Sequence, residues 1–256
     1  MLAVQNIGVS FGGLAALRDV SFRVEKDEVA SVIGPNGAGK TTLFNVITGF
    51  RKPTFGQVNF RDHSVTGMVP NAIARLGVVR TFQKTEVFPG LTVLECVRMG
   101  SLCHRRFSVF EVLRRGAGVR EFERRATTRA LELLEFVGLA GKELQLARAL
   151  SYGEQRLLEV AVCLAADPQL LLLDEPASGM NPDEAQRMGV LIGKLRDNSI
   201  SVLLVEHNMA LVMDISDRIV VLHHGEKIAE GTPEEIASNP EVVKAYLGSG
   251  WENARH

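Results

Sequence analysis

The sequence predicts an α/β fold built around a phosphate-binding loop, on three observations. A Gly-rich segment fitting G-x-x-x-x-G-K-[ST] lies between an apolar, β-branched run at 29–33 and a segment of helical periodicity at 41–47. After Ser151, apolar runs alternate with helical patterns, which is typical of parallel strands joined by crossover helices. Between about Leu91 and Leu150 the apolar residues fall at helical spacing without strand-like alternation, which predicts a helical insert.

The Gly-rich segment has the spacing and the surroundings of a nucleotide-binding loop. Its glycines allow successive backbone N–H groups to converge on an anion at a helix N-terminus. Lys40 is expected to reach the β- and γ-phosphates of a nucleotide, and the Thr41 hydroxyl is expected to ligate Mg²⁺. The expected phosphate contacts are Gly34, Pro35, Asn36, Gly37, Ala38, Gly39, Lys40, Thr41 and Thr42.

Length, charge and cysteine content narrow the classes of function. The 256 residues suffice for one large core, or for a core with an inserted subdomain. A formal net charge of −1 gives no reason to expect nucleic acid as a partner. The three cysteines contain no C-x-x-C pair, so neither a disulfide framework nor a zinc site is expected. We find no leader and no membrane-spanning stretch, so we expect a cytoplasmic protein that reaches a membrane only through a partner.

Residues 1–90 are expected to form short strands around the loop and its helix. Alternating apolar residues predict the strands, and Gly12-Gly13 and Lys26-Asp27 predict turns. Pro70 begins a segment that predicts a short helix. The expected strands are 2–4, 20–24, 29–33, 57–60 and 77–82, and the expected helices are 41–47 and 70–76.

The C-terminal part is expected to return to alternating strands and helices. The runs 170–173 and 201–205 are continuous and apolar, as in central strands buried on both faces, and 182–196 is the expected crossover helix. Residues 218–229 predict a hairpin, and two final helices are expected, each with a capping residue before a proline.

Two carboxylates, Asp174 and Glu175, follow the run of leucines at the carboxyl edge of a predicted parallel strand. Ligands of open α/β sheets bind at this edge. Asp174 is therefore a candidate Mg²⁺ ligand, and Glu175 is a candidate acceptor of the proton from an attacking water. The alternative is that both carboxylates only end the strand, and the complete phosphate loop nearby in the fold favours the functional interpretation.

A capped helix start lies at Ser151. Ser151 and Glu154 have the spacing of a capping box at the head of a helix expected over 155–166. Such an end, with a small residue at Gly153, exposes N–H groups and the positive end of the helix dipole, which suits a second phosphate contact. The pattern alone leaves open whether the segment contacts a phosphate or only caps the helix.

Six ordered segments resemble the motif set of ABC-type ATPases, and the resemblance spans nearly the whole chain. The segments are Gly34–Thr42, Gln83, Leu150–Gln155, Leu170–Glu175, Ser178–Asn181 and His207. The resemblance implies the ABC ATPase fold, an α/β P-loop NTPase core with an N-terminal antiparallel β-subdomain and an inserted helical subdomain. The expected divisions are 1–90 for the β-subdomain and first part of the core, 91–155 for the helical insert and signature segment, 156–236 for the second part of the core, and 237–256 for a C-terminal helix and tail.

The resemblance also implies an ATP site shared by two subunits. ATP would lie between the phosphate loop of one subunit and Ser151, Gly153 and Glu154 of the other. The expected catalytic residues are Glu175, Lys40, His207 and Gln83, the expected metal ligands are Thr41, Gln83 and Asp174, and the implied adenine contacts are Phe11 and Ala16.

Three of these residues have simpler alternatives. Phe11 fits an ordinary core aromatic, and an isolated Gln or His at a strand end is usually a satisfied polar residue. Gln83 and His207 each follow a predicted strand at the sheet edge that carries Asp174, which favours the functional role.

Finer features resemble the ATP-binding subunits of branched-chain amino-acid importers. They are Tyr152, Arg80-Thr81-Phe82-Gln83, Glu206–Met209 and the ending 239–248. This branch implies an ATPase that powers an importer, working with a second ATPase subunit (self or paralogue), with permease subunits and, indirectly, with a substrate-binding protein, on the inner face of the cell membrane. Importers of urea, amides and aromatic acids share these features. Asn181 departs from the wider family pattern, which has Asp there.

Other classes remain open at this point. A soluble ABC-type ATPase would share the motifs without a membrane partner, and a small-molecule kinase would share the phosphate loop but leave Ser151–Gln155 and His207 without a role. DNA-maintenance relatives need long coiled-coil inserts, and 91–150 lacks sustained heptads. The Arg-rich segment 105–129 is expected to be a solvated helical face interrupted by Gly116 and Gly118, rather than a surface for lipid or a membrane partner.

Overall fold

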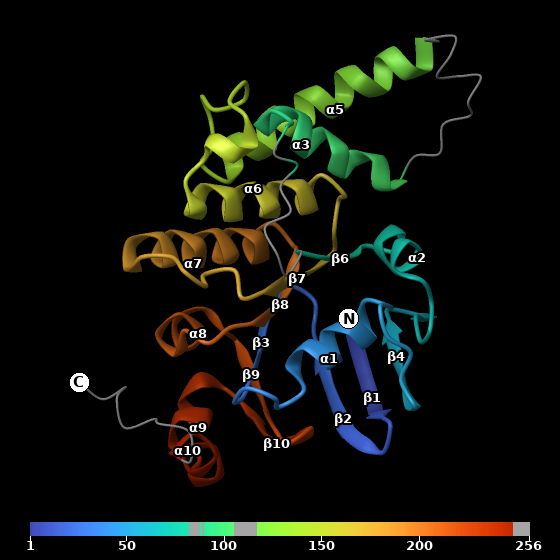
Figure 1. Cartoon of the computed structure of the whole chain (residues 1–256), viewed down its shortest axis with the longest axis vertical. Coiled ribbons are helices and arrows are strands. Elements are labelled where there is room, and N and C mark those ends of the chain that lie inside the picture. The colour runs from blue at the N-terminus through green and yellow to red at the C-terminus, as the bar shows by residue number, and fades with distance from the viewer. Residues whose placement is uncertain (82–87, 89, 105–116, 248–256) are drawn as a thin grey trace.

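The computed structural model describes residues 1–81, 88, 90–104 and 117–247, and these form two β-sheets with helices packed around them (Figure 1). In the described residues the larger sheet has strand order β10-β9-β3-β8-β7-β6, and the smaller sheet has order β2-β1-β4-β5. The strands are β1 (Leu2–Phe11), β2 (Leu14–Val24), β3 (Val29–Ile33), β4 (Phe55–Phe60), β5 (His63–Ser64), β6 (Val78–Arg80), β7 (Leu170–Asp174), β8 (Ser201–Val205), β9 (Arg218–His223) and β10 (Glu226–Gly231).

Helices join the strands and form most of the insert. The α-helices are α1 (Lys40–Ile47), α2 (Pro70–Arg75), α3 (Val93–Gly100), α5 (Ala117–Phe136), α6 (Tyr152–Leu164), α7 (Pro182–Asp197), α8 (Met209–Ile215), α9 (Pro233–Ser238) and α10 (Pro240–Leu247), and the 3₁₀ helices are η1 (Ser101–His104) and η2 (Ala147–Ala149).

The larger sheet is parallel from β6 to β9 and buries side chains on both faces, as the leucine run predicted. In β7, Leu170 and Leu172 enter one apolar cluster, with α1 and the smaller sheet. Leu171 and Leu173 point the other way, into a cluster with α6, α7 and the insert. Because side chains of a strand alternate between faces, a fully apolar strand needs cover on both, and these clusters supply it.

The smaller sheet is antiparallel and packs over α1. β1 pairs with β2 through the turn at Gly12-Gly13 and with β4 on its other side. Phe44 of α1 and Phe60 of β4 are fully buried in the same cluster as the sheet's inward side chains. The predicted antiparallel subdomain beside the nucleotide loop is therefore confirmed.

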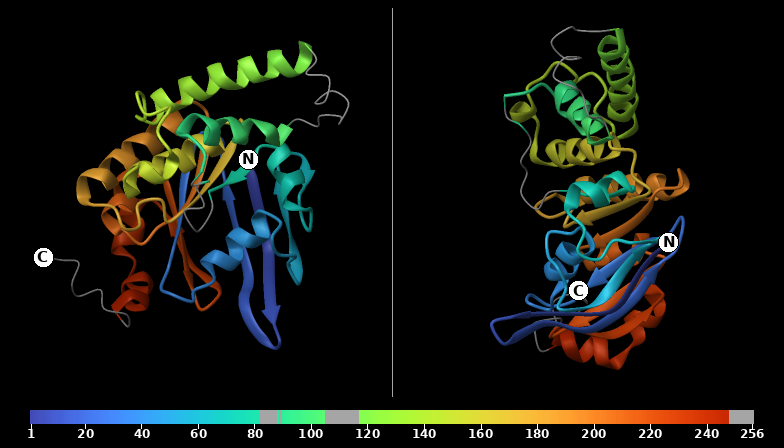
Figure 2. Two further views of the ribbon diagram at one scale, coloured as in Figure 1. Left: turned by 45° about the horizontal axis from the view of Figure 1, so that its top comes forward. Right: turned by 90° about the vertical axis from the view of Figure 1, so that its right-hand side faces the viewer.

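The insert and the C-terminal helices lie at opposite ends of the molecule. α3 and α5 form the top of Figure 1 and α9 and α10 its base, and the turned views of Figure 2 keep this separation. The predicted helical insert is confirmed. α5 contains Gly118 as the second of its described residues, so Gly118 lies inside a helix, whereas Gly116, the other expected interruption, lies outside the described residues. Arg120, Arg124, Arg125 and Arg129 of α5 are exposed, as expected of a solvated face.

The insert is joined to the core helix α6 through a close backbone approach. A Cβ atom at Gly100, the last residue of α3, would lie 2.1 Å from the Val162 carbonyl oxygen of α6. The α6 backbone cannot move aside as the end of a flexible side chain can, so only glycine fits at the crossing of α3 and α6.

The substitution Gly100→Ala should therefore lower the free energy of unfolding by about 1–3 kcal/mol, because overpacking pushes α3 off α6. Urea denaturation followed by circular dichroism measures the change. Gly118→Ala is the matched control, since nothing lies within 4 Å of its added methyl group. The control should leave stability unchanged or raise it by up to about 1 kcal/mol. Equal stability of both variants would contradict the close approach.

Candidate nucleotide site

The predicted phosphate-binding loop runs from the end of β3 into the start of α1. Gly37 and Gly39 have φ of 80° and 104°, in the left-handed region that favours glycine. A Cβ atom at Gly34 would lie 2.1 Å from the carbonyl oxygen of Leu222 in β9. The glycines thus serve both the turn of the loop and its close contact with the sheet.

Lys40 is buried, at 6% exposure, and holds the loop in a closed curve. Its Nζ donates to the carbonyl oxygens of Gly34 (2.6 Å) and Pro35 (3.0 Å). Burial lowers the pKa of Lys40, while the charges of Glu175 and Asp174 act in the opposite direction. Lys40 therefore stabilises the loop through hydrogen bonds and also lies near the predicted carboxylates Asp174 and Glu175.

The predicted catalytic residues Glu175 and His207 meet at the carboxyl edge of the larger sheet. Glu175 follows β7 and His207 comes shortly after the adjacent strand β8. His207 Nε2 lies 3.0 Å from Glu175 Oε1. Glu175 has a φ of 51°, a left-handed conformation that is strained for a non-glycine residue and is found at functional sites. About 40% of its side chain is exposed, so water and ligands can reach it.

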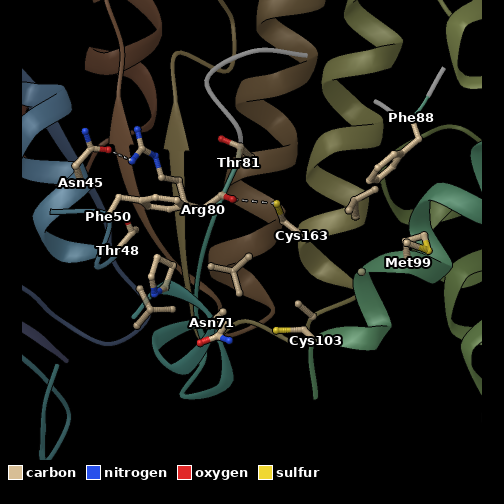
Figure 3. A pocket seen from close by; sticks show the side chains of 17 residues that line it. Asn45, Thr48, Phe50, Asn71, Arg80, Thr81, Phe88, Met99, Cys103 and Cys163 are labelled. Carbon is tan, nitrogen blue, oxygen red and sulfur yellow. Dashed lines mark hydrogen bonds between the residues drawn. The ribbon is translucent and has the colours of Figure 1, made fainter. Parts of the chain in front are cut away.

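Asp174 ends β7 and is almost fully buried, and its partner is an arginine whose role we did not predict. Arg80 at the end of β6 donates from Nη2 to Asp174 Oδ2 at 2.7 Å. Its Nη1 donates to Asn45 Oδ1 of α1, also at 2.7 Å (Figure 3). The pairing of Arg80 with Asp174 could have been predicted, because each residue ends a strand and the ends of parallel neighbours such as β6 and β7 meet at one edge of the sheet.

The oxygen donors at this edge fit Mg²⁺. Thr41 offers an exposed hydroxyl at the start of α1 and Asp174 offers a carboxylate. Within the described ranges, no cluster of three or more His, Cys, Asp or Glu side chains could hold a metal by itself. A cation with one or two protein ligands and the remainder from phosphates and water is the usual arrangement for Mg²⁺. Gln83, the third expected ligand, lies outside the described residues.

The two predicted adenine contacts lie on the neighbouring strands β1 and β2. The Phe11 ring, at the end of β1, is 44% exposed and is therefore not a core aromatic. The guanidinium of Arg51 stacks over it, with 3.9 Å from Cζ to the ring centroid. Ala16 lies against the loop, since a Cβ atom at Gly39 would be 2.8 Å from its carbonyl oxygen. Arg51 is a neighbour of Phe11 that the sequence did not reveal.

The segment at Ser151 forms the predicted capping box at the start of α6. The Ser151 hydroxyl accepts from the Glu154 N–H, and the Glu154 carboxylate accepts from the Ser151 N–H. Lys142 also pairs with Glu154, and this pair is the largest cause of the lowered pKa of Glu154. Gly153 packs against Glu184 at the start of α7. In the part of the chain that the structure describes, none of these contacts reaches the loop 34–42.

The C-terminal helix α10 packs beside the start of the phosphate-binding loop through Tyr246. Tyr246 packs against the cluster that contains Ile33, the last residue of β3. Burial raises the pKa of Tyr246, and a hydrogen bond from the Gly34 backbone acts in the opposite direction. The end of the described chain thus reaches the first residue of the phosphate loop.

A cavity of about 540 Å³ opens between the core, α2 and the insert (Figure 3). Its wall is mainly apolar and includes Phe50, Phe88 and Met99, which are 43–65% exposed. Arg80 and Asn45 also line it, so the cavity adjoins the ion pair of Asp174.

Comparison with known proteins assigns the chain to a family. The ABC transporter family model matches residues 17–178, and the model of a branched-chain amino acid ATP-binding cassette transporter matches residues 226–252. A high-affinity branched-chain amino acid transport ATP-binding protein, LivG of Salmonella typhimurium, is 45% identical over 97% of this chain and 98% of its own length. BraF of Pseudomonas aeruginosa, described in the same terms, is also 45% identical over 97% of this chain and 98% of its own length.

A solved structure supports the same assignment. The crystal structure of the ADP conformation of an ATP-binding cassette from an ABC transporter has a TM-score of 0.84 and 34% identity, covering 97% of this chain and 98% of the other. The chain therefore belongs to the ABC transporter family and is one of its ATP-binding, ATP-hydrolysing subunits.

Proposed function

We propose that the chain powers an importer for branched-chain amino acids or a similar small polar solute by binding and hydrolysing ATP. The observation that carries the catalytic part is the convergence of Lys40, Asp174 and the Glu175–His207 pair at one edge of the sheet. The relatives named above, which are amino acid transport proteins matched over nearly their full length, support the solute class. Urea or amides are the alternative solutes.

In this proposal the loop 34–42 cradles the triphosphate through its N–H groups and Lys40. Lys40 exchanges its bonds to the loop carbonyls for bonds to phosphate oxygens, which are stronger because both partners are charged. Phe11 stacks on the adenine, with Ala16 beside it. Thr41 and Asp174 would hold Mg²⁺, which would offset the charge on the terminal phosphates.

Glu175 and His207 are proposed as the hydrolytic residues. The Glu175 carboxylate orients a water and accepts its proton, and His207, already in contact with Glu175, contacts the γ-phosphate. Gln83 is proposed as a further ligand and sensor from its place in the sequence. Lys40 and the loop N–H groups stabilise the charge that develops during transfer.

A second subunit is proposed to complete the site. In a single copy the segment Ser151–Glu154 contacts α7 and Lys142 rather than the loop, and its helix end is exposed. This end carries the partial positive charge of a helix N-terminus, which stabilises an anion. In a dimer with itself or a paralogue, Ser151, Gly153 and Glu154 would cover the γ-phosphate bound to the other subunit.

The transmembrane partner is proposed to bind at the cavity between core and insert. No described helix is both long and apolar enough to span a bilayer, so transport needs other chains. The cavity exposes Phe50 on one side and Phe88 and Met99 on the other, and a permease segment with apolar side chains would bury them (Figure 3). This contact would keep the chain on the inner face of the membrane. Co-purification without any membrane protein would favour instead a soluble ABC-type ATPase.

Glu175→Gln should leave ATP binding within about twofold of wild type while lowering turnover by about 10²–10⁴-fold, because the amide cannot accept the proton from water. Phosphate release and nucleotide titration measure the two quantities. Glu132→Gln is the control, as an equal change of charge on an exposed side chain of α5 in the helical insert. Turnover by Glu175→Gln at the wild-type rate would rule out the proton-acceptor role.

Lys40→Ala should weaken ATP binding by about 10–100-fold, the loss expected for hydrogen bonds to a charged group. Calorimetric titration with Mg-ATP measures the effect. Lys194→Ala, on α7 away from the loop, should bind as wild type does. Undiminished affinity in Lys40→Ala would exclude this lysine from phosphate binding.

A further inference from the structure

Arg80 stands between the metal-binding edge and the cavity. One arm of its guanidinium donates to Asp174 and the other to Asn45, both at 2.7 Å. The side chains of Arg80 and Asp174 are only 10% and 2% exposed. Arg80 also lines the cavity, and its backbone carbonyl accepts from the Cys163 thiol on α6 (Figure 3). A single residue therefore contacts the carboxylate, α1 and the face toward the insert.

When no metal cation is bound at Asp174, the Arg80–Asp174 ion pair stabilises the folded state. A carboxylate as buried as Asp174 is strongly destabilising when left without a partner. Arg80 is the cation that the structure places on it, and the planar fork of the guanidinium lets it hold Asn45 at the same time. The charge of Asp174 acts on Lys40, but the Lys40 ammonium donates its hydrogen bonds to the loop carbonyls of Gly34 and Pro35 rather than to Asp174.

The same pair is unfavourable once the carboxylate holds a divalent cation. The guanidinium then sits close to a like charge in a poorly hydrated place, where repulsion is only weakly screened. Asn45 continues to anchor one arm, so the other can move away from Asp174 without exposing the whole side chain. The side on which Arg80 has room is the cavity, which it already lines.

We propose that Arg80 is a positioning residue that occupies Asp174 in the metal-free protein and releases it when the site takes Mg²⁺, moving toward the cavity wall. This rests on the proposed function in one respect, the assignment of Asp174 as a Mg²⁺ ligand. Because binding free energies are reciprocal, a partner that fills the cavity and disfavours the released arginine would also weaken Mg²⁺ binding. Arg80 thereby links the metal site to the surface between core and insert.

The test measures how much Mg²⁺ strengthens nucleotide binding without turnover. A non-hydrolysable ATP analogue, AMP-PNP, is titrated into the full chain in EDTA and in saturating Mg²⁺, and the ratio of the two affinities is the readout. In Arg80→Gln this ratio should be about tenfold larger than in wild type, because a competing charge has been removed. Arg80→Lys keeps the charge but cannot bond Asp174 and Asn45 through a planar fork, so its ratio should fall between those of wild type and Arg80→Gln. A ratio in Arg80→Gln equal to or below the wild-type ratio would overturn the proposal.

The matched control is Arg75→Gln on α2, an arginine close in sequence that donates to the Cys103 carbonyl oxygen and does not contact Asp174 in the described part of the chain. It should leave the ratio unchanged.

A second readout needs no variant: phenylglyoxal labelling of Arg80 in wild type, followed by mass spectrometry, should increase several-fold when Mg²⁺ is added to the AMP-PNP complex. Unchanged labelling would also overturn the proposal. Wild type with no Mg²⁺ effect would show that the metal assignment of the proposed function has failed, whereas a normal wild-type effect shared by Arg80→Gln would reject the role of Arg80 alone.

Discussion

The parallel pairing of β6, β7 and β8 is the constraint on which the site depends. Arg80 lies opposite Leu172, and Asp174 lies opposite Val205, so three strands end within a residue or two of one another. Parallel neighbours share a carboxyl edge, and whatever follows each strand is brought together there. The contacts of Arg80 with Asp174, and of Glu175 with His207, both follow from this register. A slip by one residue would reverse the side-chain directions and remove them.

Burial on both faces of the sheet makes this register specific. The leucines of β7 alternate between the cluster that contains α1 and the cluster that contains α6 and α7. The first cluster carries the phosphate loop, and the second carries the segment at Ser151 and the insert. The sheet therefore fixes the position of the catalytic edge relative to both the loop and the helices that would meet a partner.

Local features of this arrangement could be predicted from the sequence, because their cause lies within a few residues. The loop glycines, the four leucines before Asp174 and the capping box at Ser151 belong to this group, and the structure confirms the elements that they predict. Contacts across the sequence could not be predicted. Arg80 and Asp174 are 94 positions apart, and Arg51 reaches Phe11 from another element. Gly118 can lie inside α5 because one glycine costs a helix only about 1 kcal/mol. The domain divisions and the site roles, including that of Gln83, stay predictions.

The central claim is that one copy of the chain provides only half of each ATP site. Two variants test it when mixed: Lys40→Ala, which damages the loop, and Ser151→Asp, which keeps a good helix cap but places a negative charge against the phosphate. Each alone should be nearly inactive. An equimolar mixture should regain about a quarter of wild-type ATPase activity, because about half of the dimers are mixed and each of these has one intact site. A mixture no more active than its two components, or full activity of Ser151→Asp alone, would contradict an ATP site shared between two copies of this chain.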